Sequence, residues 1–523
     1  MSGGAYRAMI MLAGTLQQLH EKNVLGKIDY LSAVSGGTYA ASIFTYYQQQ
    51  AKNDSELLGP FVPPYMLTAE FLSSVPMERL IYPATLDPIP VRNKLVELIS
   101  LKKESPRFLW YDTFASTVLD YFLGAGKSMF SGFTLNRKSR VHLMQLNPNL
   151  NETDFLIPMQ PNRPYLILLS SLTTPVETAP LDISVSPSPI PFEWTPLYAG
   201  YPKLHKNRVY YGLNGATIRH VQLGGLVSPF AAYSETVSLK KVSESLLLKV
   251  NSTLNRIGSL GDAVGAATNF GAFYFQTNSS KSVRNIFASV FNNNPEAEVG
   301  PVYPIVSVKA NQDIKTKRRN VPFYLADGGF SSNTPILSLI ARGVKKIIAL
   351  SCTEFALANR TIYNPLKQGY VLGAIDSGIA AFFGFNTPES NFFEKHTRVF
   401  DQKDFPRVVT AMQLNQEAGK GAFARVTLTT VANLAYGIHP GLKVDIAFFL
   451  LSSSDMFISQ LPLAVQQDIA LGSKGQFANF PYYQTFFQNG PSFTTYTPKQ
   501  ANLLYFLQSF IILQNWDEIK DMF

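Results

Sequence analysis

The chain has 523 residues, of which 46% are hydrophobic and 15% charged, which indicates a folded globular protein and excludes a disordered or fibrous one. The one cysteine, Cys352, excludes an internal disulfide and with it a disulfide-stapled secreted scaffold. The formal net charge of +9 favours an anionic partner, either nucleic acid or an anionic membrane surface.

Two patterns decide between these partners. The chain has no zinc-finger spacing and no aromatic–basic RNA signature, and its densest basic run, 315–319, is typical of a solvated loop, so we expect no nucleic acid. No stretch approaches the ~18–20 uninterrupted apolar residues that a membrane-spanning helix needs. The apolar run 503–513 is too short and predicts a core or interfacial helix. We therefore expect a cytoplasmic protein that contacts a membrane surface.

The first 50 residues predict a helix, a strand and a second helix. Apolar residues from 5 to 19 recur at helical spacing. Residues 28–34 predict a buried strand, and Ser35-Gly36-Gly37 predicts a tight turn. A second helix is expected over 38–49. This order of elements is typical of an α/β protein.

A second group of elements is predicted near residue 330. Residues 322–326 predict a strand, and Asp327-Gly328-Gly329 predicts the turn at its end. Asn333 is a suitable N-cap for a short helix that ends at Arg342. A further strand is expected over 345–351.

The remaining elements are expected as helices at 89–103, 111–123 and 235–260, a strand at 165–169 and a proline-punctuated stretch at 175–196. We interpret 1–523 as a single catalytic domain. The block at about 54–320 is expected to contain cap or lid insertions, and 370–523 is expected to be the C-terminal part of the same domain.

Ala33-Val34-Ser35-Gly36-Gly37 fits the small-x-Ser-x-Gly form of a nucleophile elbow. In such an elbow a serine sits on a sharp strand-to-helix turn, and its neighbours must be small because the backbone is crowded. Taken alone, Ser-Gly-Gly is also a common turn. The pattern makes Ser35 a candidate nucleophile.

Two further turns supply complementary chemistry. Gly3 and Gly4 precede a helix, where backbone N–H groups can hold an anion or the oxyanion of acyl transfer; a phosphate site or a flexible segment are the alternatives. Asp327 follows a strand and could be a general base or a turn residue. An open α/β sheet places its site at such loops, so the three together favour an acyl-transfer site.

A histidine base is the alternative to Asp327 acting alone. The order Ser35, Asp327, His439 matches the Ser…Asp…His order of α/β-hydrolases. That fold, however, needs several strands before its elbow, and only 34 residues precede Ser35. We therefore predict a Ser–Asp dyad and retain a Ser–His–Asp lipase that uses His439 as the alternative.

The segments 2–9 and 30–38 resemble the catalytic domain of cytosolic phospholipase A(2) and the fungal lysophospholipases (phospholipase B), and more distantly patatin. The resemblance continues in Phe192-Glu193-Trp194-Thr195-Pro196, in Asp327-Gly328-Gly329 with Asn333 and Pro335, and in Asn479-Phe480-Pro481-Tyr482-Tyr483.

The resemblance implies a three-layer α/β/α fold with an inserted cap or lid that admits lipid. It implies a histidine-free dyad with Ser35 as nucleophile and Asp327 as base. Gly3 and Gly4 would form the oxyanion hole, and Arg7 would bind the substrate phosphate. The implied substrate is a phospholipid or lysophospholipid at a membrane surface, with no metal and no organic cofactor.

The sequence departs from this family at its start. Ala5 stands where the family usually has a third glycine, and the buried strand that normally leads into Ser-Gly-Gly is missing. We expect a truncated form of a longer protein, whose missing N-terminus could also carry a targeting segment. A catalytically impaired lipid-binding or scaffold protein is the alternative, and transfer of the acyl group to an alcohol instead of water is a third possibility.

Overall fold

The computed structural model describes residues 1–86, 116–215, 217–231, 237–242, 245–250, 257–269, 303–310, 319–387, 396–483 and 496–523. Two compact units are present. Unit 1 comprises Met1–Phe44, Gln50–Pro88 and Ser332–Phe523, and unit 2 comprises Thr45–Gln49 and Ile89–Ser331. Unit 2 overlaps the block in which insertions were predicted.

Unit 1 contains a sheet with the strand order β12 (Lys346–Ser351), β14 (Lys443–Leu450) and β13 (Ala422–Thr429). The pair β12–β14 is parallel and the pair β13–β14 is antiparallel. The strand predicted over 345–351 is thus present. A parallel pair together with flanking helices confirms the predicted α/β class.

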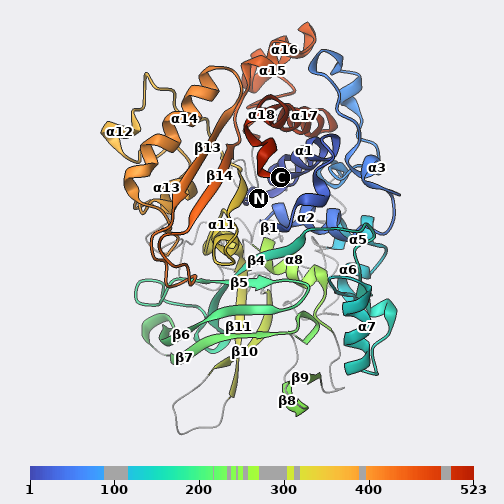
Figure 1. The fold of residues 1–523 in the computed structure, drawn as a ribbon, viewed down its shortest axis with the longest axis vertical. Helices are drawn as coiled ribbons and strands as arrows, with labels where there is room; N and C mark the ends of the chain where they lie inside the picture. The colour runs from blue at the N-terminus through green and yellow to red at the C-terminus, as the bar shows by residue number, and fades with distance from the viewer. Residues whose placement is uncertain are drawn as a thin grey trace. The chain divides into compact units, whose positions relative to one another are not determined.

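The N-terminal elements of unit 1 are α1 (Ala5–Glu21), β1 (Tyr30–Val34) and α2 (Gly37–Tyr46), which confirms the helix–strand–helix prediction. Helix α1 lies beside α17 (Pro498–Gln514), as Figure 1 shows. Gly14 permits this approach, because a Cβ there would lie 2.4 Å from the carbonyl oxygen of Tyr505. The run predicted as a core or interfacial helix therefore lies in the core.

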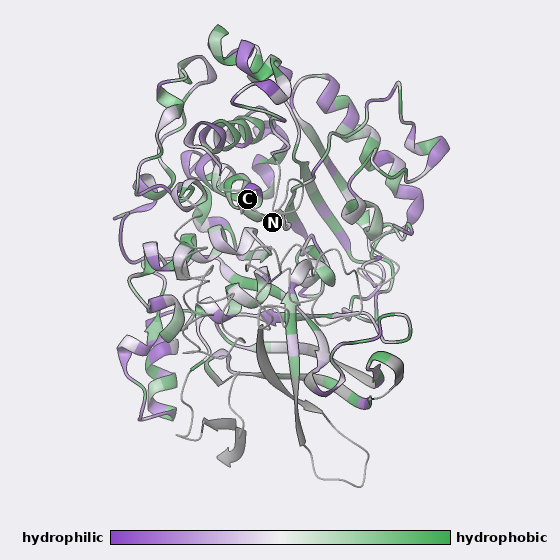
Figure 2. Ribbon diagram, turned by 180° about the vertical axis from the view of Figure 1, so that it is seen from behind, coloured by the Kyte–Doolittle hydropathy of each residue, from purple (hydrophilic) through white to green (hydrophobic). Residues whose placement is uncertain are grey.

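An extensive apolar core of unit 1 lies between the sheet and α14 (Phe405–Glu417), where Ile347, Val409 and Phe448 are all buried. In Figure 2, β14 is purple where it begins and green over its later residues. This gradient follows the sequence Lys-Val-Asp-Ile-Ala-Phe-Phe-Leu, whose polar residues come first. The apolar residues in the later part of β14 therefore supply its contacts with this core.

The remaining helices of unit 1 are α3 (Asp54–Leu58), α11 (Ile336–Ile340), α12 (Pro365–Gln368), α13 (Ser377–Phe382), α15 (Asp455–Ile458), α16 (Leu463–Ala470) and α18 (Trp516–Ile519), followed by the 3-10 turn η16 (Lys520–Met522).

Unit 2 contains an antiparallel sheet in the order β10 (Tyr303–Ala310), β11 (Arg319–Asp327), β4 (Tyr165–Pro175), β5 (Ile190–Trp194), β6 (Ala199–Tyr211) and β7 (Ile218–Val227). Its described helices are α5 (Ser116–Leu123), α6 (Lys127–Phe130), α7 (Arg137–Leu146) and α8 (Leu260–Thr268). Two short pairs of strands are also present. Strand β2 (Gly132–Phe133) pairs with β3 (Phe155–Leu156), and β8 (Val237–Val242) pairs with β9 (Ser245–Val250).

The structure corrects several local predictions. The helix predicted over 235–260 is wrong, because β8 and β9 pair antiparallel there and α8 begins only at Leu260. Valines at both ends of β8 and at the end of β9 favour extended backbone. Helix α11 begins at Ile336 with Pro335 at its N-cap position, so Asn333 is not the cap. The helix predicted at 89–103 and most of the basic run 315–319 lie outside the described residues.

Among the described helices, none combines the length and the apolar character that crossing a membrane requires.

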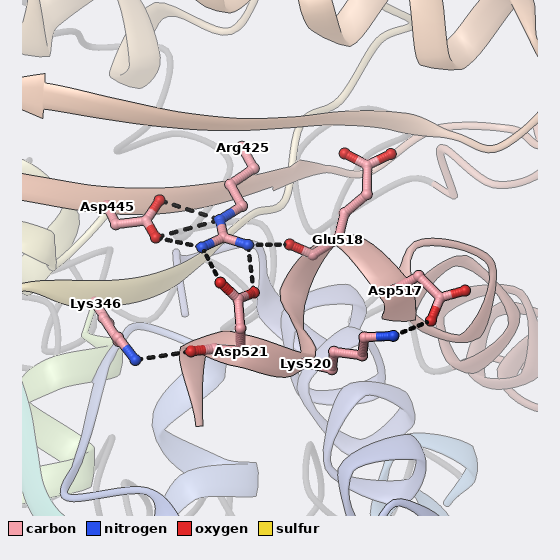
Figure 3. A network of polar contacts seen from close by, with 7 residues as sticks. All are labelled: Lys346, Arg425, Asp445, Asp517, Glu518, Lys520 and Asp521. Atoms are coloured by element: carbon pink, nitrogen blue, oxygen red, sulfur yellow. Dashed lines mark hydrogen bonds and ion pairs between the residues drawn. The ribbon is translucent and has the colours of Figure 1, made fainter.

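A network of charged groups holds the C-terminal turn against the sheet of unit 1 (Figure 3). Arg425 of β13 binds Asp445 of β14 at 2.6 Å and also both carboxylate oxygens of Asp521. Lys346 of β12 donates to the carbonyl oxygen of Asp521 at 2.7 Å. The hydrogen bonds from Arg425 hold the pKa of Asp521 below its usual value. The network therefore fixes η16 at the start of β12.

We predict that Arg425→Met lowers the free energy of unfolding by roughly 1–3 kcal/mol, because it leaves the half-buried Asp445 without its charged partner. Urea denaturation measures this change. Lys520→Met is the control, because the exposed Lys520–Asp517 pair should leave stability unchanged.

The same network predicts a pH dependence. The folded-state pKa of Asp521 is lowered, so its stabilisation is complete above the unfolded pKa of about 3.9 and is lost as the pH falls through the folded value. Asp521→Asn should remove this part of the loss below about pH 4. An identical acid profile in the variant and the parent would contradict the assignment.

Candidate active site

Ser35 occupies a strained turn between β1 and α2. Its φ is +50°, in the left-handed region that costs a non-glycine residue of order 1–3 kcal/mol. The turn is held by Thr38, whose N–H and hydroxyl donate to the carbonyl oxygen of Ser35 at 2.9 and 2.6 Å. The side chain is half-buried, and no described residue of unit 1 takes a hydrogen bond from its hydroxyl. A strained, accessible serine at a strand-to-helix turn has the geometry of a nucleophile elbow.

The next residue, Gly36, lies directly against the start of α1. A Cβ at Gly36 would lie 1.9 Å from the carbonyl oxygen of Ala5. The clash would involve backbone, which cannot move aside as a flexible side chain can. Glycine at position 36 is therefore required for the two turns to touch.

The glycine loop that precedes α1 is equally crowded. A Cβ at Gly3 would lie 2.5 Å from Asn333 Oδ1 and 2.8 Å from Ser35 Cβ, and one at Gly4 would lie 2.7 Å from Cys352 Sγ. Gly4 has a φ of +142° and Ala5 a φ of +50°. The structure thus brings Gly3 and Ser35 together.

The backbone N–H groups of this loop differ in whether they already donate a hydrogen bond. The N–H of Gly3 donates to Asn333, at 3.1 Å to its carbonyl and 3.2 Å to its Oδ1. The N–H groups of Gly4 and Ala5 make no hydrogen bond to a described residue. They stand at the start of a 17-residue helix, where N–H groups lack helical partners and the dipole favours negative charge. These two amides are the available donors for an anion beside Ser35.

The loop is anchored on both sides by strands. Ser2 donates its N–H to the carbonyl of Leu350 at 2.9 Å, and its hydroxyl accepts from the N–H of Cys352 at 2.6 Å. On the other side, the N–H of Val34 donates to the carbonyl of Met1 at 3.3 Å. The glycines are therefore positioned by the ends of β1 and β12.

Arg7 lies inside unit 1 and is only 1% exposed. Its Nη1 donates to the carbonyl of Tyr483 at 2.7 Å and its Nε to Cys352 Sγ at 3.3 Å. Its Nη2 lies 3.6 Å from the carboxylate of Glu354, which is 53% exposed, and makes no hydrogen bond. Burial by itself lowers the pKa of Arg7, but Cys352, Tyr496 and Glu354 outweigh it, so the pKa is raised. Arg7 is a buried cation with one unused donor.

The facing Cys352 is neutral. Burial raises the pKa of its thiol, and the opposing effect of Arg7 is smaller. The Cys352 side chain is buried. Its sulfur acts as a hydrogen-bond acceptor for Arg7 and as the wall against Gly4.

Asp327 belongs to unit 2, where it ends β11 and is buried. Its Oδ1 accepts from the N–H of Gly329 at 2.8 Å, and its own N–H donates to the carbonyl of Asn269 at 3.0 Å. The predicted turn at 327–329 is present as η12 (Gly328–Phe330). Pairing of Asp327 with Ser35 stays a prediction.

His439 is exposed and precedes β14. Strand β12 is parallel to β14 and ends at Ser351, beside the residue that contacts Gly4. His439 therefore lies at the opposite end of these strands, about 20–25 Å away for strands of this length at roughly 3.3 Å per residue. This position argues against the triad that uses His439.

Sequence reasoning missed two of the residues that shape the site. The sequence predicts Asn333 as a helix cap, but Asn333 accepts the hydrogen bond from Gly3 instead, and Tyr483 supplies the carbonyl that binds Arg7. Both residues lie in segments that resemble the phospholipase family, and this resemblance is the sequence signal that could have identified them. Among the described residues, no group of three or more His, Cys, Asp or Glu side chains could hold a metal ion.

No protein-family model and no curated protein matches the chain. Among solved structures, it is similar to human GIVD cytosolic phospholipase A2, with a TM-score of 0.47, 14% identity and coverage of 100% of this chain and 59% of that one. The complex of that protein with methyl gamma-linolenyl fluorophosphonate gives 0.42 and 15%, and the complex that also contains terbium chloride gives 0.41 and 13%. Both cover 99% of this chain and 57% of the other. The chain thus spans less than two thirds of the length of these structures.

We predict that Gly36→Ala destabilises the protein by at least about 3 kcal/mol, because the new Cβ would overlap the carbonyl of Ala5. Gly441→Ala is the control: it has a φ of +92° but open space around it, so it should cost only about 1–2 kcal/mol of backbone strain. Urea denaturation compares the two. Equal losses would show that the contact between the two turns is not as tight as described.

Proposed function

We propose that the chain is a serine esterase that hydrolyses fatty-acyl esters of phospholipids or lysophospholipids at a membrane surface. The observation that carries the proposal is the strained Ser35, packed against a glycine loop with two unused amides at a helix start. The resemblance of residues 2–9 and 30–38 supports the substrate class. The net charge of +9 suits an anionic lipid surface.

The reaction would begin with Asp327 as the base. Its carboxylate takes the proton from Ser35 Oγ, which attacks the ester carbonyl carbon and forms a tetrahedral oxyanion. The amides of Gly4 and Ala5 stabilise that oxyanion; the amide of Gly3, which the resemblance also assigned to the oxyanion hole, donates to Asn333 instead. The C–O bond then breaks, and the alcohol leaves with the proton from Asp327. Water activated by the same carboxylate releases the fatty acid from Ser35.

The chain path supports Asp327 as the base. Asn333, which binds the N–H of Gly3, follows Asp327 by six positions. The segment that leaves the end of β11 is therefore the segment that reaches the glycine loop. Asp327 is also buried, so its carboxylate is shielded from bulk water.

Arg7 would bind the substrate phosphate through its Nη2. That atom has no hydrogen bond and faces the exposed Glu354 at 3.6 Å. A phosphate could replace the Glu354 carboxylate as the anionic partner, because the glutamate side chain can turn into solvent. Guanidinium groups suit phosphate through paired N–H donors.

We predict that Ser35→Ala and Asp327→Asn each reduce fatty-acid release by at least about 10³-fold while the thermal unfolding temperature stays near that of the parent. Release from phosphatidylcholine vesicles and from lysophosphatidylcholine micelles measures activity. Ser42→Ala is the control, because Ser42 lies on α2, which follows Ser35, and has an unpaired hydroxyl. Asp182→Asn is the control for the aspartate.

The outcomes separate the alternatives. Full activity in Asp327→Asn together with loss in His439→Ala would replace the dyad with a triad. A well-folded parent that releases no fatty acid would favour a lipid-binding or scaffold protein. Acyl transfer to added lysolipid in preference to water would identify a transacylase.

We predict that Arg7→Lys lowers activity on phospholipids by about 10–100-fold but leaves hydrolysis of an uncharged p-nitrophenyl ester within about threefold. Lysine keeps the charge but loses the forked donors. Glu354→Gln should leave the phospholipid KM nearly unchanged or lower it, because it removes the carboxylate that competes with the substrate phosphate for Arg7. Equal losses on both substrates in Arg7→Lys would show that Arg7 only supports the fold.

A further inference from the structure

Cys352 is the first residue after β12, and it lies where the glycine loop meets Arg7. Its backbone is held on both sides. The N–H of Cys352 donates to Ser2 Oγ at 2.6 Å, and the carbonyl of the preceding Ser351 accepts from the N–H of Leu451 at 2.8 Å. The Cys352 side chain is only 4% exposed. Its sulfur is therefore presented to the loop from a fixed point at the end of a strand.

The Cys352 side chain packs directly against Gly4. A Cβ at Gly4 would lie 2.7 Å from Cys352 Sγ and 3.1 Å from Cys352 Cβ, whereas the next atom, Ala8 Cβ, would be 3.6 Å away. Gly4 has a φ of +142°, and its N–H makes no hydrogen bond to a described residue. Packing against the sulfur is therefore a main constraint on the direction of the Gly4 amide.

The same sulfur fixes the plane of the Arg7 guanidinium. Arg7 Nε donates to Cys352 Sγ at 3.3 Å, and Nη1 donates to the carbonyl of Tyr483 at 2.7 Å. Because the guanidinium is planar, two bonds to two separate acceptors fix the direction of Nη2, which has no hydrogen bond. Loss of the sulfur would leave Nε buried without an acceptor and would let the group turn about its bond to Tyr483.

The thiol accepts this bond as a neutral group. Burial raises the pKa of Cys352, and the opposing effect of Arg7 is smaller, so the thiol keeps its proton. A buried carboxylate at the same position would cancel much of the positive charge of Arg7. The sulfur therefore orients the guanidinium and leaves its charge available to an anion.

We propose that Cys352 is a positioning residue for both halves of the site: its sulfur holds the Gly4 amide beside Ser35 and orients the Arg7 guanidinium. The inference rests on the proposed function, in which Gly4 stabilises the oxyanion and Arg7 binds the substrate phosphate. In this role Cys352 contacts neither the ester nor the phosphate. The side chain at position 352 thus links the rate of acyl transfer to recognition of the phosphate.

Steady-state kinetics of Cys352→Ala test the proposal. With an uncharged p-nitrophenyl ester, kcat should fall by at least about tenfold and KM should stay nearly unchanged, because an oxyanion donor acts in the transition state. With phosphatidylcholine vesicles, KM should also rise by about tenfold, because Arg7 is no longer oriented.

Val444→Ala is the control for lost core volume. Val444 is buried near the start of β14, which runs parallel to β12, so it lies at the end of the sheet opposite to Cys352. Its truncation removes apolar contacts without touching the glycine loop. We expect kcat and KM to stay within about threefold of the parent for both substrates.

Two further variants separate positioning from a general loss of packing. Cys352→Ala combined with Arg7→Lys should lose less activity on phosphatidylcholine than the product of the two single losses, because both changes damage one interaction. Cys352→Ser provides a hydroxyl oxygen that can accept from Arg7 Nε. It should therefore recover much of the preference for phosphatidylcholine over the uncharged ester. Multiplicative losses and no recovery would overturn the role of Cys352 in orienting Arg7.

Two measurements are independent of hydrolysis. Isothermal titration calorimetry with glycerophosphocholine, which carries the phosphate diester but no carboxylic ester, should give a Kd about tenfold higher in Cys352→Ala than in the parent. Hydrogen exchange over residues 2–8, measured by mass spectrometry, should be at least about tenfold faster in Cys352→Ala, because the loop loses its support. Val444→Ala should leave both quantities unchanged.

The outcomes distinguish this inference from the proposed function. An active parent in which Cys352→Ala matches Val444→Ala in kinetics, binding and exchange would overturn the inference and leave the esterase intact. A parent that hydrolyses no ester, but whose binding and exchange still depend on Cys352, would overturn the proposed function and support the positioning role. A fall in kcat with unchanged glycerophosphocholine binding would remove Arg7 from the inference.

Discussion

The site depends on one close contact, that between the turn at Ser35 and the start of α1. Gly36 lies so near the carbonyl of Ala5, and Gly3 so near Ser35, that side chains at these glycines would overlap their neighbours. The contact fixes a strained serine beside the first amides of a helix. Electrostatic catalysis requires such donors to be in place before charge develops. A loose arrangement of the same residues would have little catalytic value.

Two strand ends hold that contact. Strand β1 leads into Ser35, and β12 ends beside Ser2 and Cys352, so the glycine loop is bonded from both sides. Arg7 adds a third attachment, because its buried guanidinium joins α1 to Tyr483 and Cys352.

The sequence predicted the elements whose signals are local. Helical spacing predicted α1, an apolar run predicted β12, and Ser35-Gly36-Gly37 predicted the tight turn between β1 and α2. The sequence-based prediction failed where contacts with residues distant in the sequence determine the role or conformation of a segment. The role of Asn333 depends on Gly3, more than 300 positions away, and its local context favoured a helix cap. Residues 237–242 and 245–250 pair as antiparallel strands, although the sequence predicts a helix there.

The most direct measurement is a crystal structure of the protein after reaction with a fluorophosphonate ester. The account predicts phosphorus bonded to Ser35 Oγ, a phosphoryl oxygen within about 3 Å of the amides of Gly4 and Ala5, and the Asp327 carboxylate within hydrogen-bond reach of Ser35 Oγ. A phosphonyl group on another residue would contradict the account, as would a labelled Ser35 whose phosphoryl oxygen points away from the glycine loop.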